Sequence, residues 1–501
     1  MNLFNLLTIF SISGAILTAL MVWRGVHKVW WMSFLQNFTG VWLLFSGVVK
    51  AIDPIGTQYK MEQYFAEFET TFAGTKMAFL APMFPALSKY ALGFSIFMIL
   101  FELVLGLMLI IGVRPKVSSW LLFWLMLFFT ALTGFTYMTA YVPQGENFFE
   151  FGKWGPYLAS NMRVTDCGCF GDFIKLIPRT SFFKDIFLMG IVVTFLLNHK
   201  KMHVLFTRPW RFGLTVFSII ASFVFCLQNT FWNLPMVDFR PFKIGTDLVA
   251  KKEAEEKAAA AIQITGYIME NQKTGEKQQV DVPSGQEAAK FYVDYIYKNF
   301  PKDAGWKVLD QVKTEPTVEH TKVSDLSLSN MEGSDYTEDI LSDEKPSFLI
   351  VAPKLYTDKV IEKSIFVPDT IWQLDTVRTA TTMTITKSLS SAGQKEIPVT
   401  EYTWSEDYLK NYKEKIAPLA KAAKAAGYKV NFAGPPTAPE KMRSFAKAAG
   451  LETNVDFYTC DDLVLKTIIR SNPGTVLLKK GVVKDMWHIN QLPAFEAINL
   501  K

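Results

Sequence analysis

Cysteine and histidine are scarce in this chain of 501 residues, which contains four cysteines and five histidines. Four cysteines are too few for a small scaffold that depends on several disulfides. They also form no Cys-x-x-Cys pair that would supply half of a tetrahedral zinc site. The formal net charge is only +5, and the lysines form no stripe with interleaved aromatic residues. A nucleic-acid partner is therefore not expected.

Apolar residues are abundant, and they are concentrated in the first half of the chain. Up to about Trp232 the sequence is dominated by Phe, Leu, Ile, Met and Trp, whereas after Asp238 it has the charge content of a soluble domain. A membrane-spanning helix needs about 20 mainly apolar residues. Six segments qualify: Leu3–Trp23, Phe34–Ile52, Tyr90–Val113, Ser118–Tyr141, Phe182–Asn198 and Arg211–Trp232. The first segment has no basic start and no cleavage site, so we interpret it as a retained helix.

The charges of the short loops predict the orientation of these spans. The loops after the first, third and fifth spans contain basic residues and no acidic ones: Arg24 and Lys28; Arg114 and Lys116; Lys200, Lys201, Arg208 and Arg211. Such loops face the cytoplasm. We therefore expect an inner-membrane protein whose N-terminus, long loops (53–89 and 142–181) and C-terminal half face the periplasm, where disulfides persist.

Four residues in or beside the spans have ionisable or thiol side chains: Lys50, Asp53, Glu102 and Cys226. Glu102 lies mid-span, where an ionisable side chain indicates either function or a carboxyl group hydrogen-bonded to a neighbouring helix. Lys50, near the outer end of the second span, either snorkels to the interface or pairs with Asp53. Cys226, near the outer end of the sixth span, is either a small apolar residue or a third thiol at the depth of the outer loop.

The segment "TDCGCFGDFIKL" holds two of the cysteines, Cys167 and Cys169, separated by Gly168. A disulfide between them requires a sharp turn, which glycine permits, because the two Cα atoms must lie about 4.4–6.8 Å apart. Such a bridge is strained and easily reduced, and it closes almost no chain. The spacing favours a redox exchange centre over a structural bridge. A metal site with oxygen from Asp166 and Asp172 is the third interpretation.

Three separated segments carry a family resemblance: "LLFSGVVKAIDPIGTQYK", "FELVLGLMLIIG" and "DCGCFGDFIKLIPRTSFFKD". In this order they resemble the DoxX/MauE-like membrane proteins, especially the Bacteroidetes-type members with a fused periplasmic domain. The resemblance covers roughly residues 34–200 and implies a four-helix bundle with envelope thiol chemistry at Cys167 and Cys169. MauE relatives are implicated in maturing a disulfide-rich dehydrogenase, and DoxX relatives in sulfur and quinone-linked redox, so a quinone is the cofactor it implies. Residues 1–33 would be an additional helix with its loop, and 201–237 the last span and its exit.

The remainder of the chain is expected to form a linker and one α/β domain. Residues 238–322 contain a short helix, a hairpin around Lys-Thr-Gly-Glu and a polar stretch. Residues 323–501 alternate strands and helices and end in two strands joined at Lys-Lys-Gly, followed by a short helix. This order resembles the TlpA/peroxiredoxin-like branch of the thioredoxin fold, with residues 356–405 as an insertion. The Asn472-Pro473 bond would match the cis-proline of that fold.

One departure from the thioredoxin pattern changes the expected role of this domain. After its first core strand the sequence is "PKLYTDK", with no Cys-x-x-Cys. Its only cysteine, Cys460, precedes a helix, where a thiol either has a lowered pKa or is buried and inert. We therefore expect a module that binds a client or a redox partner.

Two functions from different classes follow. In the first, the protein takes part in periplasmic thiol–disulfide exchange through Cys167 and Cys169, and either Cys226 or a quinone near Glu102 relays the electrons. In the second, it is a non-enzymatic, membrane-anchored scaffold or assembly factor of an envelope complex. A transporter is disfavoured, because Glu102 and Lys50 are few polar groups for a pathway and no inverted repeat is apparent.

Overall fold

The computed structural model describes residues 3–164, 168–378 and 383–500, and for residues 368–393 it describes no side chains. Cys167 therefore lies outside the described residues. The chain divides into two compact units. One comprises Met1–Lys243 with Ala250–Ser324, and the other comprises Ile244–Val249 with Asp325–Lys501.

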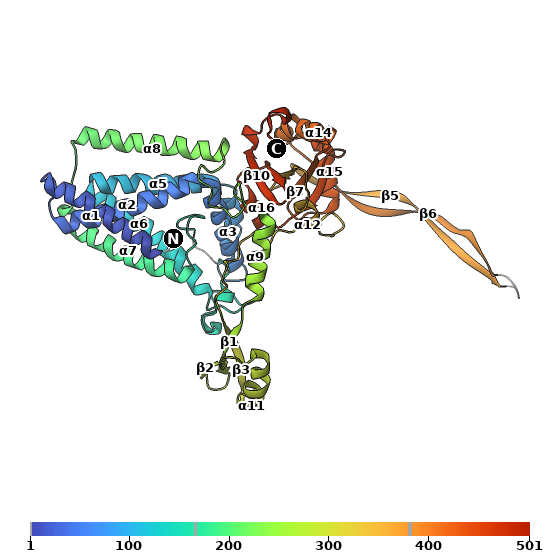
Figure 1. Ribbon diagram of the computed structural model, residues 1–501, viewed down its shortest axis with the longest axis horizontal. Coiled ribbons are helices and arrows are strands. Elements are labelled where there is room, and N and C mark those ends of the chain that lie inside the picture. Colours follow the sequence, from blue (N-terminus) through green and yellow to red (C-terminus); the bar gives the residue numbers. More distant parts are fainter. Residues whose placement is uncertain (1–2, 165–167, 379–382, 501) are drawn as a thin grey trace. The chain divides into compact units, whose positions relative to one another are not determined.

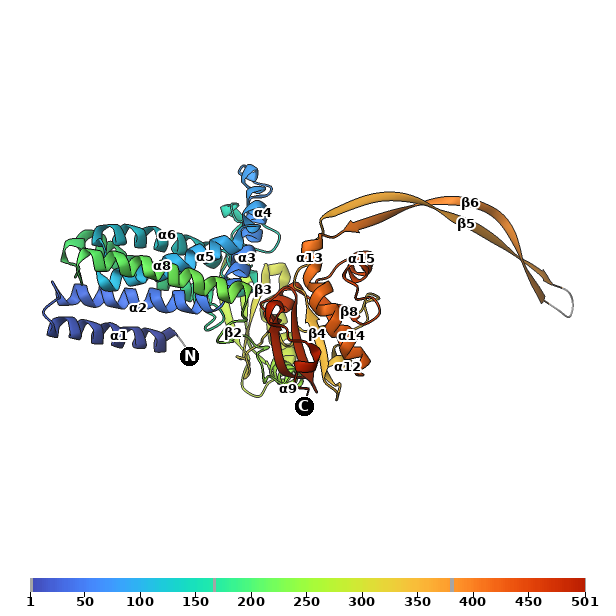
Figure 2. The same cartoon turned by 90° about the horizontal axis from the view of Figure 1, so that it is seen from above.

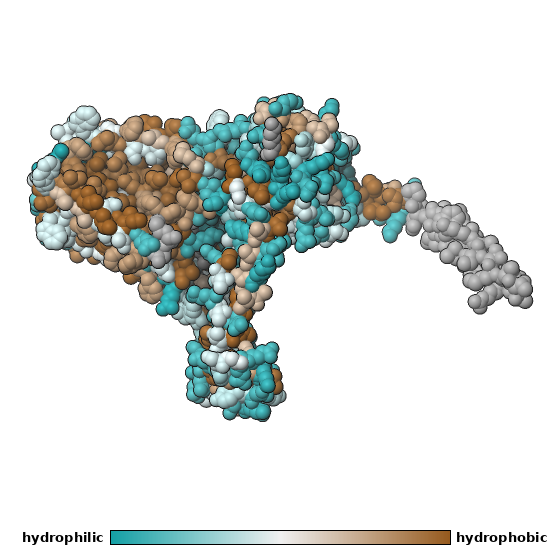
Figure 3. All heavy atoms as spheres, in the orientation of Figure 1, coloured by the Kyte–Doolittle hydropathy of each residue, from teal (hydrophilic) through white to brown (hydrophobic). Residues whose placement is uncertain are grey.

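Six helices of the first unit are long and apolar enough to cross a membrane. They are α1 (Leu3–Trp23), α2 (Trp30–Ile52), α5 (Ala91–Ile111), α6 (Pro115–Thr139), α7 (Pro178–Asn198) and α8 (Arg208–Phe231). They confirm the predicted spans to within about one helical turn at each end. Figures 1 and 2 show them lying lengthwise side by side, and Figure 3 shows the apolar surface that they present.

Helices α2 and α5 approach each other closely because glycines line their contact. A Cβ atom at Gly40 would lie 2.6 Å from Ile110 Cγ1 and 2.9 Å from the carbonyl oxygen of Gly106. A Cβ atom at Gly47 would lie 2.7 Å from Leu103 Cγ. Small residues permit such close helix packing within a membrane. As a result, polar side chains on the two helices can meet directly.

The outer segments of this unit contain shorter helices. Asp53 begins α3 (Pro54–Phe72), and its Oδ1 accepts a hydrogen bond of 2.8 Å from the backbone N–H of Gly56. A short α4 (Met83–Ser88) follows. The loop between α6 and α7 returns into the bundle at Phe170, whose fully buried ring packs with its centroid 6.4 Å from that of Trp42. The segment that carries Cys169 is therefore anchored in the bundle rather than lying on its surface.

The remainder of the first unit is a small α+β region. Helix α9 (Leu248–Ala260) confirms the expected short helix, and β1 (Ile264–Asn271) and β2 (Lys277–Asp281) confirm the hairpin. A third strand, β3 (Trp306–Lys313), pairs with β1 where a polar stretch was expected. Trp306 accounts for the difference, because its ring packs against Phe300 and contributes an apolar residue to the region's small core.

The second unit contains a five-stranded sheet in the order β10-β9-β4-β7-β8. Its strands are β4 (Ser347–Val351), β7 (Lys429–Gly434), β8 (Asp456–Thr459), β9 (Gly474–Lys479) and β10 (Val482–His488). Strand β7 runs parallel to β4 and β8, whereas β9 is antiparallel to β4 and β10. This unit is thus an α/β domain, as expected from the alternation of strands and helices.

Helices cover this sheet, and the predictions for its periphery were partly wrong. The main helices are α13 (Glu406–Asn411), α14 (Ala417–Ala425), α15 (Pro439–Ala449) and α16 (Asp462–Ile468). The strand expected after Val323 is absent among the described residues, where only isolated bridges form at Ser329 before α12 (Thr337–Leu341). The final helix is a single 3₁₀ turn, Phe495–Ala497. The Asn472-Pro473 bond is cis, as the resemblance implies.

The expected insertion forms a long two-stranded ribbon. Strand β5 (Lys359–Arg378) pairs antiparallel with β6 (Met383–Thr403), and together they form a sheet separate from the core of the second unit. Figure 2 shows the ribbon extending from the α/β domain. Near its base, large apolar side chains are exposed, including Ile365, Phe366 and Val360. An isolated pair of strands is at best marginally stable in water.

Candidate active site in the membrane bundle

Glu102 of α5 and Lys50 of α2 form a buried ion pair. Lys50 Nζ lies 2.5 Å from Glu102 Oε1, and the two residues are 5% and 1% exposed. Both proposed roles of Lys50 are therefore wrong: it does not snorkel to the interface, and Asp53 caps α3 instead of pairing with it. The physical reason is the close approach of α2 and α5, because a buried charge is stabilised chiefly by an opposite charge at short range.

The Lys50 ammonium group has three neighbours in the bundle: Glu102, Ser46 and the Phe129 ring. Its Nζ donates hydrogen bonds to Glu102 Oε1 and, at 3.2 Å, to Ser46 Oγ, and it lies 5.1 Å from the centroid of the Phe129 ring. An ammonium group has three donors and no acceptor. The ion pair therefore has hydrogen-bond and ring contacts inside the bundle, and its role depends on the segments that these contacts connect.

Ser46 connects this ion pair to the cysteine loop. Its Oγ lies 2.9 Å from Glu102 Oε2 and 3.0 Å from the carbonyl oxygen of Cys169. A hydroxyl group has one proton, so Ser46 donates to one of these acceptors at a time. Gly168 has a φ of +61°, and a Cβ atom there would lie 2.9 Å from Lys60 Cγ. The requirement for glycine between the two cysteines is therefore both conformational and steric.

The Cys169 thiol lies beside a second buried cation, Lys184 of α7. Lys184 Nζ is 3.5 Å from Cys169 Sγ, 2.6 Å from Asp185 Oδ1 and 6.0 Å from the ring centroids of Trp42 and Phe170. A neighbouring cation favours the thiolate, which is the reactive form of cysteine. The bundle therefore holds the sulfur atom in a setting that suits nucleophilic exchange.

Asp185 fixes this cation in turn. It is 1% exposed at its side chain, and its Oδ2 accepts a hydrogen bond of 2.9 Å from Thr133 of α6. The sequence does not single out Lys184 and Asp185, because the predicted fifth span begins at Phe182 and charges near the start of a span are ordinary interfacial residues. The helix begins at Pro178, so both charges lie within the apolar segment. Charged residues inside a span are the signal that could have identified them.

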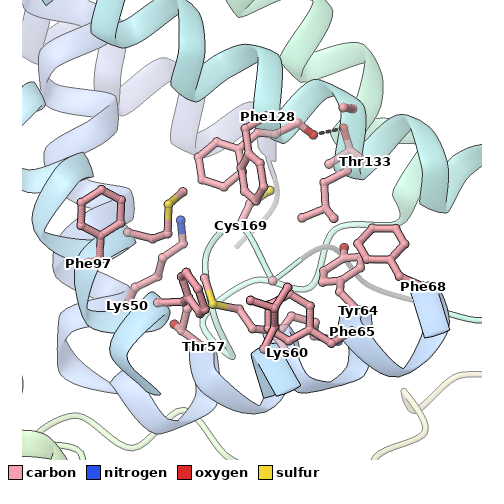
Figure 4. Close-up of a pocket in the computed structure, with 18 of the residues that line it drawn as sticks. Lys50, Thr57, Lys60, Tyr64, Phe65, Phe68, Phe97, Phe128, Thr133 and Cys169 are labelled. Atoms are coloured by element: carbon pink, nitrogen blue, oxygen red, sulfur yellow. Dashed lines mark hydrogen bonds between the residues drawn. The ribbon is translucent and has the colours of Figure 1, made fainter. Parts of the chain in front are cut away.

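A cavity of about 960 Å³ lies between α2, α3, α5, α6 and the cysteine loop. Lys50, Glu102 and Cys169 are on its wall, and most of the remaining wall is apolar. Figure 4 shows Cys169 beside Phe128, with Phe97 and Phe65 on other parts of the cavity wall. The structure thus brings together three of the predicted site residues, Lys50, Glu102 and Cys169, around one cavity.

Cys226 is not part of this arrangement. It is fully buried in a separate apolar cluster with Ala51, Ile99 and Leu103, whereas Cys169 packs against the cluster that contains Phe170. The described contacts therefore give Cys226 the surroundings of a small apolar core residue.

Cys460 of the α/β domain is likewise a buried thiol. It is 3% exposed, and burial raises the pKa of its thiol to about 12. The side chain of Asp461, rather than the thiol, caps α16. Nearby, Asn472 donates a hydrogen bond of 3.1 Å to the carbonyl oxygen of Lys354, in the segment "PKLYTDK" that follows β4. Among the residues that the structure describes, no three His, Cys, Asp or Glu side chains gather where they could hold a metal ion.

Comparisons with known proteins identify no relative. No protein-family model, no curated protein and no solved structure matches this chain. The resemblances to DoxX/MauE-like and thioredoxin-like proteins therefore stay predictions from the residues.

Proposed function

We propose that this protein takes part in thiol–disulfide exchange in the bacterial envelope, with Cys167 and Cys169 as the redox pair. The observation that carries the proposal is the Cys169 thiol, held by a loop anchored in the bundle with its Sγ 3.5 Å from Lys184 Nζ. A cysteine kept only for packing needs no cation beside it, whereas an exchanging thiol benefits from one.

The proposed chemistry begins with a Cys167–Cys169 disulfide. A client thiolate attacks one sulfur, the S–S bond breaks, and the other cysteine leaves as a thiolate. A second client thiol then loses its proton and attacks the mixed disulfide, so the client leaves as a disulfide and the pair becomes a dithiol. Two electrons pass from the client to the pair. Lys184 stabilises the thiolate whenever Cys169 is the leaving sulfur.

Reoxidation of the dithiol requires a two-electron acceptor, and we propose a membrane quinone in line with the DoxX/MauE resemblance. The quinone would take two electrons and two protons, become a quinol, and restore the Cys167–Cys169 disulfide. The apolar cavity beside Cys169 supports access from the bilayer. Cys226 has no place in this scheme, because it packs in a different cluster from Cys169.

We propose further that the α/β domain is a thioredoxin-like module that binds the client or a redox partner without exchanging thiols itself. Its support is the strand order β10-β9-β4-β7, in which two antiparallel strands follow a parallel β-α-β unit. The buried Cys460 supports a binding role over a catalytic one. The loop charges support a periplasmic location for this domain and an inner-membrane location for the bundle.

The ribbon β5–β6 favours a second candidate function, a scaffold within an envelope complex. Both strands expose apolar side chains near the base of the ribbon, including Phe366 of β5 and Val399 of β6. Exposed apolar residues and open strand edges are typical of surfaces that bind another protein. In this alternative the bundle anchors the chain, and Cys167 and Cys169 are not required.

Alkylation trapping of the full-length protein in glutathione buffers of graded potential tests the proposal. We expect Cys167 and Cys169 to change together between an alkylated and a protected state at one potential, with Cys460→Ser as a control that leaves this behaviour unchanged. If Cys169 is alkylated to the same extent at every potential, the pair does not exchange and the scaffold function is the better account.

A further inference from the structure

The cavity beside Cys169 opens toward the region where lipid would lie. Its wall includes residues from the middle and outer parts of α5 and α6, two of the helices that can cross a membrane. At its rim Phe94 and Phe97 of α5 are 39% and 59% exposed, and Phe128 of α6 is 49% exposed. Exposed aromatic side chains on a membrane span face lipid hydrocarbon, so the opening is lateral.

The charged groups on the wall of the cavity, with Thr133 and Cys169, have partners inside the protein. Lys50 and Glu102 bind each other, and Thr133 binds Asp185. Lys60 donates to Gln63 at 2.9 Å, and the Cys169 thiol lies beside Lys184. A polar head group that entered the cavity would have to give up its water for partners that are already engaged, which is unfavourable. An apolar chain would lose nothing by entering.

The size and flexibility of the cavity also suit an apolar chain. Its volume of about 960 Å³ lies at the upper end of the range for small-molecule sites. Met61 of α3 and Met98 of α5 line the cavity, and their unbranched side chains adapt to chains of different shape.

From these observations we infer that the cavity is a lipid-binding site, which takes the hydrocarbon tail of a bilayer lipid through a lateral opening between α5 and α6. The head group stays at the membrane surface. This inference goes beyond thiol exchange, because it depends on the cavity and not on the redox state of Cys167 and Cys169.

Photo-crosslinking in lipid nanodiscs tests the inference on the full-length protein, with palmitic acid carrying a mid-chain diazirine as the probe. Gly93→Phe fills the cavity, because Gly93 lines it and a Cβ atom there meets nothing within 4 Å. Gly190→Phe is the matched control, since Gly190 of α7 is equally open but lies outside the wall. Size-exclusion chromatography shows whether each variant is folded.

We expect the wild type to be labelled chiefly at Met61, Met98 and Leu132. Labelling there should fall roughly tenfold in Gly93→Phe, equivalent to about 1.4 kcal/mol of binding free energy, and stay unchanged in Gly190→Phe. If Gly93→Phe does not fold, Ala131→Phe on the opposite wall replaces it with the same expectation.

Two results would overturn the inference. One is labelling spread evenly over the exposed faces of all six spans, and the other is equal labelling in a folded cavity-filling variant and in Gly190→Phe.

Native mass spectrometry of the purified protein then distinguishes the source of the tail, because a phospholipid acyl chain and an isoprenoid chain differ in mass.

Discussion

Replacing Glu102 by Gln leaves the Lys50 ammonium group inside the bundle without a counter-ion. The structure makes this substitution costly, because Lys50 is only 5% exposed and its nearest charged partner is Glu102. Removing one partner of a buried ion pair costs about 3–5 kcal/mol. Replacing both partners by apolar residues of similar size is often neutral. The double variant Lys50→Met, Glu102→Leu should therefore be more stable than Glu102→Gln.

Cys226 provides the assay, because its buried thiol packs against Leu103, next to Glu102. In a background where the other three cysteines are serine, Cys226 is alkylated only when the bundle opens. A loss of 3 kcal/mol should speed this reaction roughly 10²-fold, since each 1.4 kcal/mol is a factor of ten. The exposed Glu150→Gln serves as a control with no expected change.

The reasoning about the ion pair would be refuted by either of two outcomes. Glu102→Gln could leave the alkylation rate of Cys226 within about threefold of the parent, less than 1 kcal/mol. Alternatively, the double variant could open as fast as Glu102→Gln or faster. In both cases Glu102 would not stabilise the charge of Lys50. The proposed connection from Glu102 of α5 through Ser46 to the cysteine loop would then lose its support.

Three further predictions concern separate elements. Phe170→Ala should cost about 3–5 kcal/mol by removing a fully buried ring, and it should speed proteolysis of the cysteine loop. Cys460 should resist alkylation up to about pH 10, because its raised pKa keeps the thiol protonated. The unfolded chain loses this proton at a lower pH than the folded domain does, so thermal unfolding should show a loss of stability only as the pH rises above about 8.5 toward 12. Asp53→Ala should cost about 1 kcal/mol by removing the cap of α3, seen as faster hydrogen exchange in its first turn.

The membrane spans were predictable because their signal is local. Runs of about 20 apolar residues have few other uses, and all six predicted segments are helices in the structure. The alternation in residues 323–501 was predictable for the same reason. Phe348 to Val351 form a buried run, and Leu419, Ala420 and Ala423 lie on the inner face of a helix. The turn between β9 and β10 was predictable from its residue types, since Lys480 and Gly481 both have positive φ and glycine favours that conformation.

The pairing of side chains across the bundle could not be predicted from the sequence. Lys50 has Asp53 three residues away, yet it binds Glu102, because the glycines of α2 and α5 bring two distant segments together. The position of Lys184 beside Cys169 depends on the loop returning to pack Phe170 in the core, which no periodicity reveals. Strand β3 was not predicted, because the stretch around it is polar apart from a few residues, of which Trp306 packs against Phe300 in the core of this region.

The rate at which a small alkylating reagent modifies Cys169 at pH 7 tests the central claim most directly. A unit charge about 4 Å from a thiolate is worth roughly 1 kcal/mol in water and about 4 kcal/mol near a protein surface. Lys184→Met should therefore slow alkylation of Cys169 at least about fivefold, and Lys184→Arg, which keeps the charge, should restore most of the rate. Equal rates in wild type, Lys184→Met and Lys184→Arg would contradict an activated thiol in the bundle.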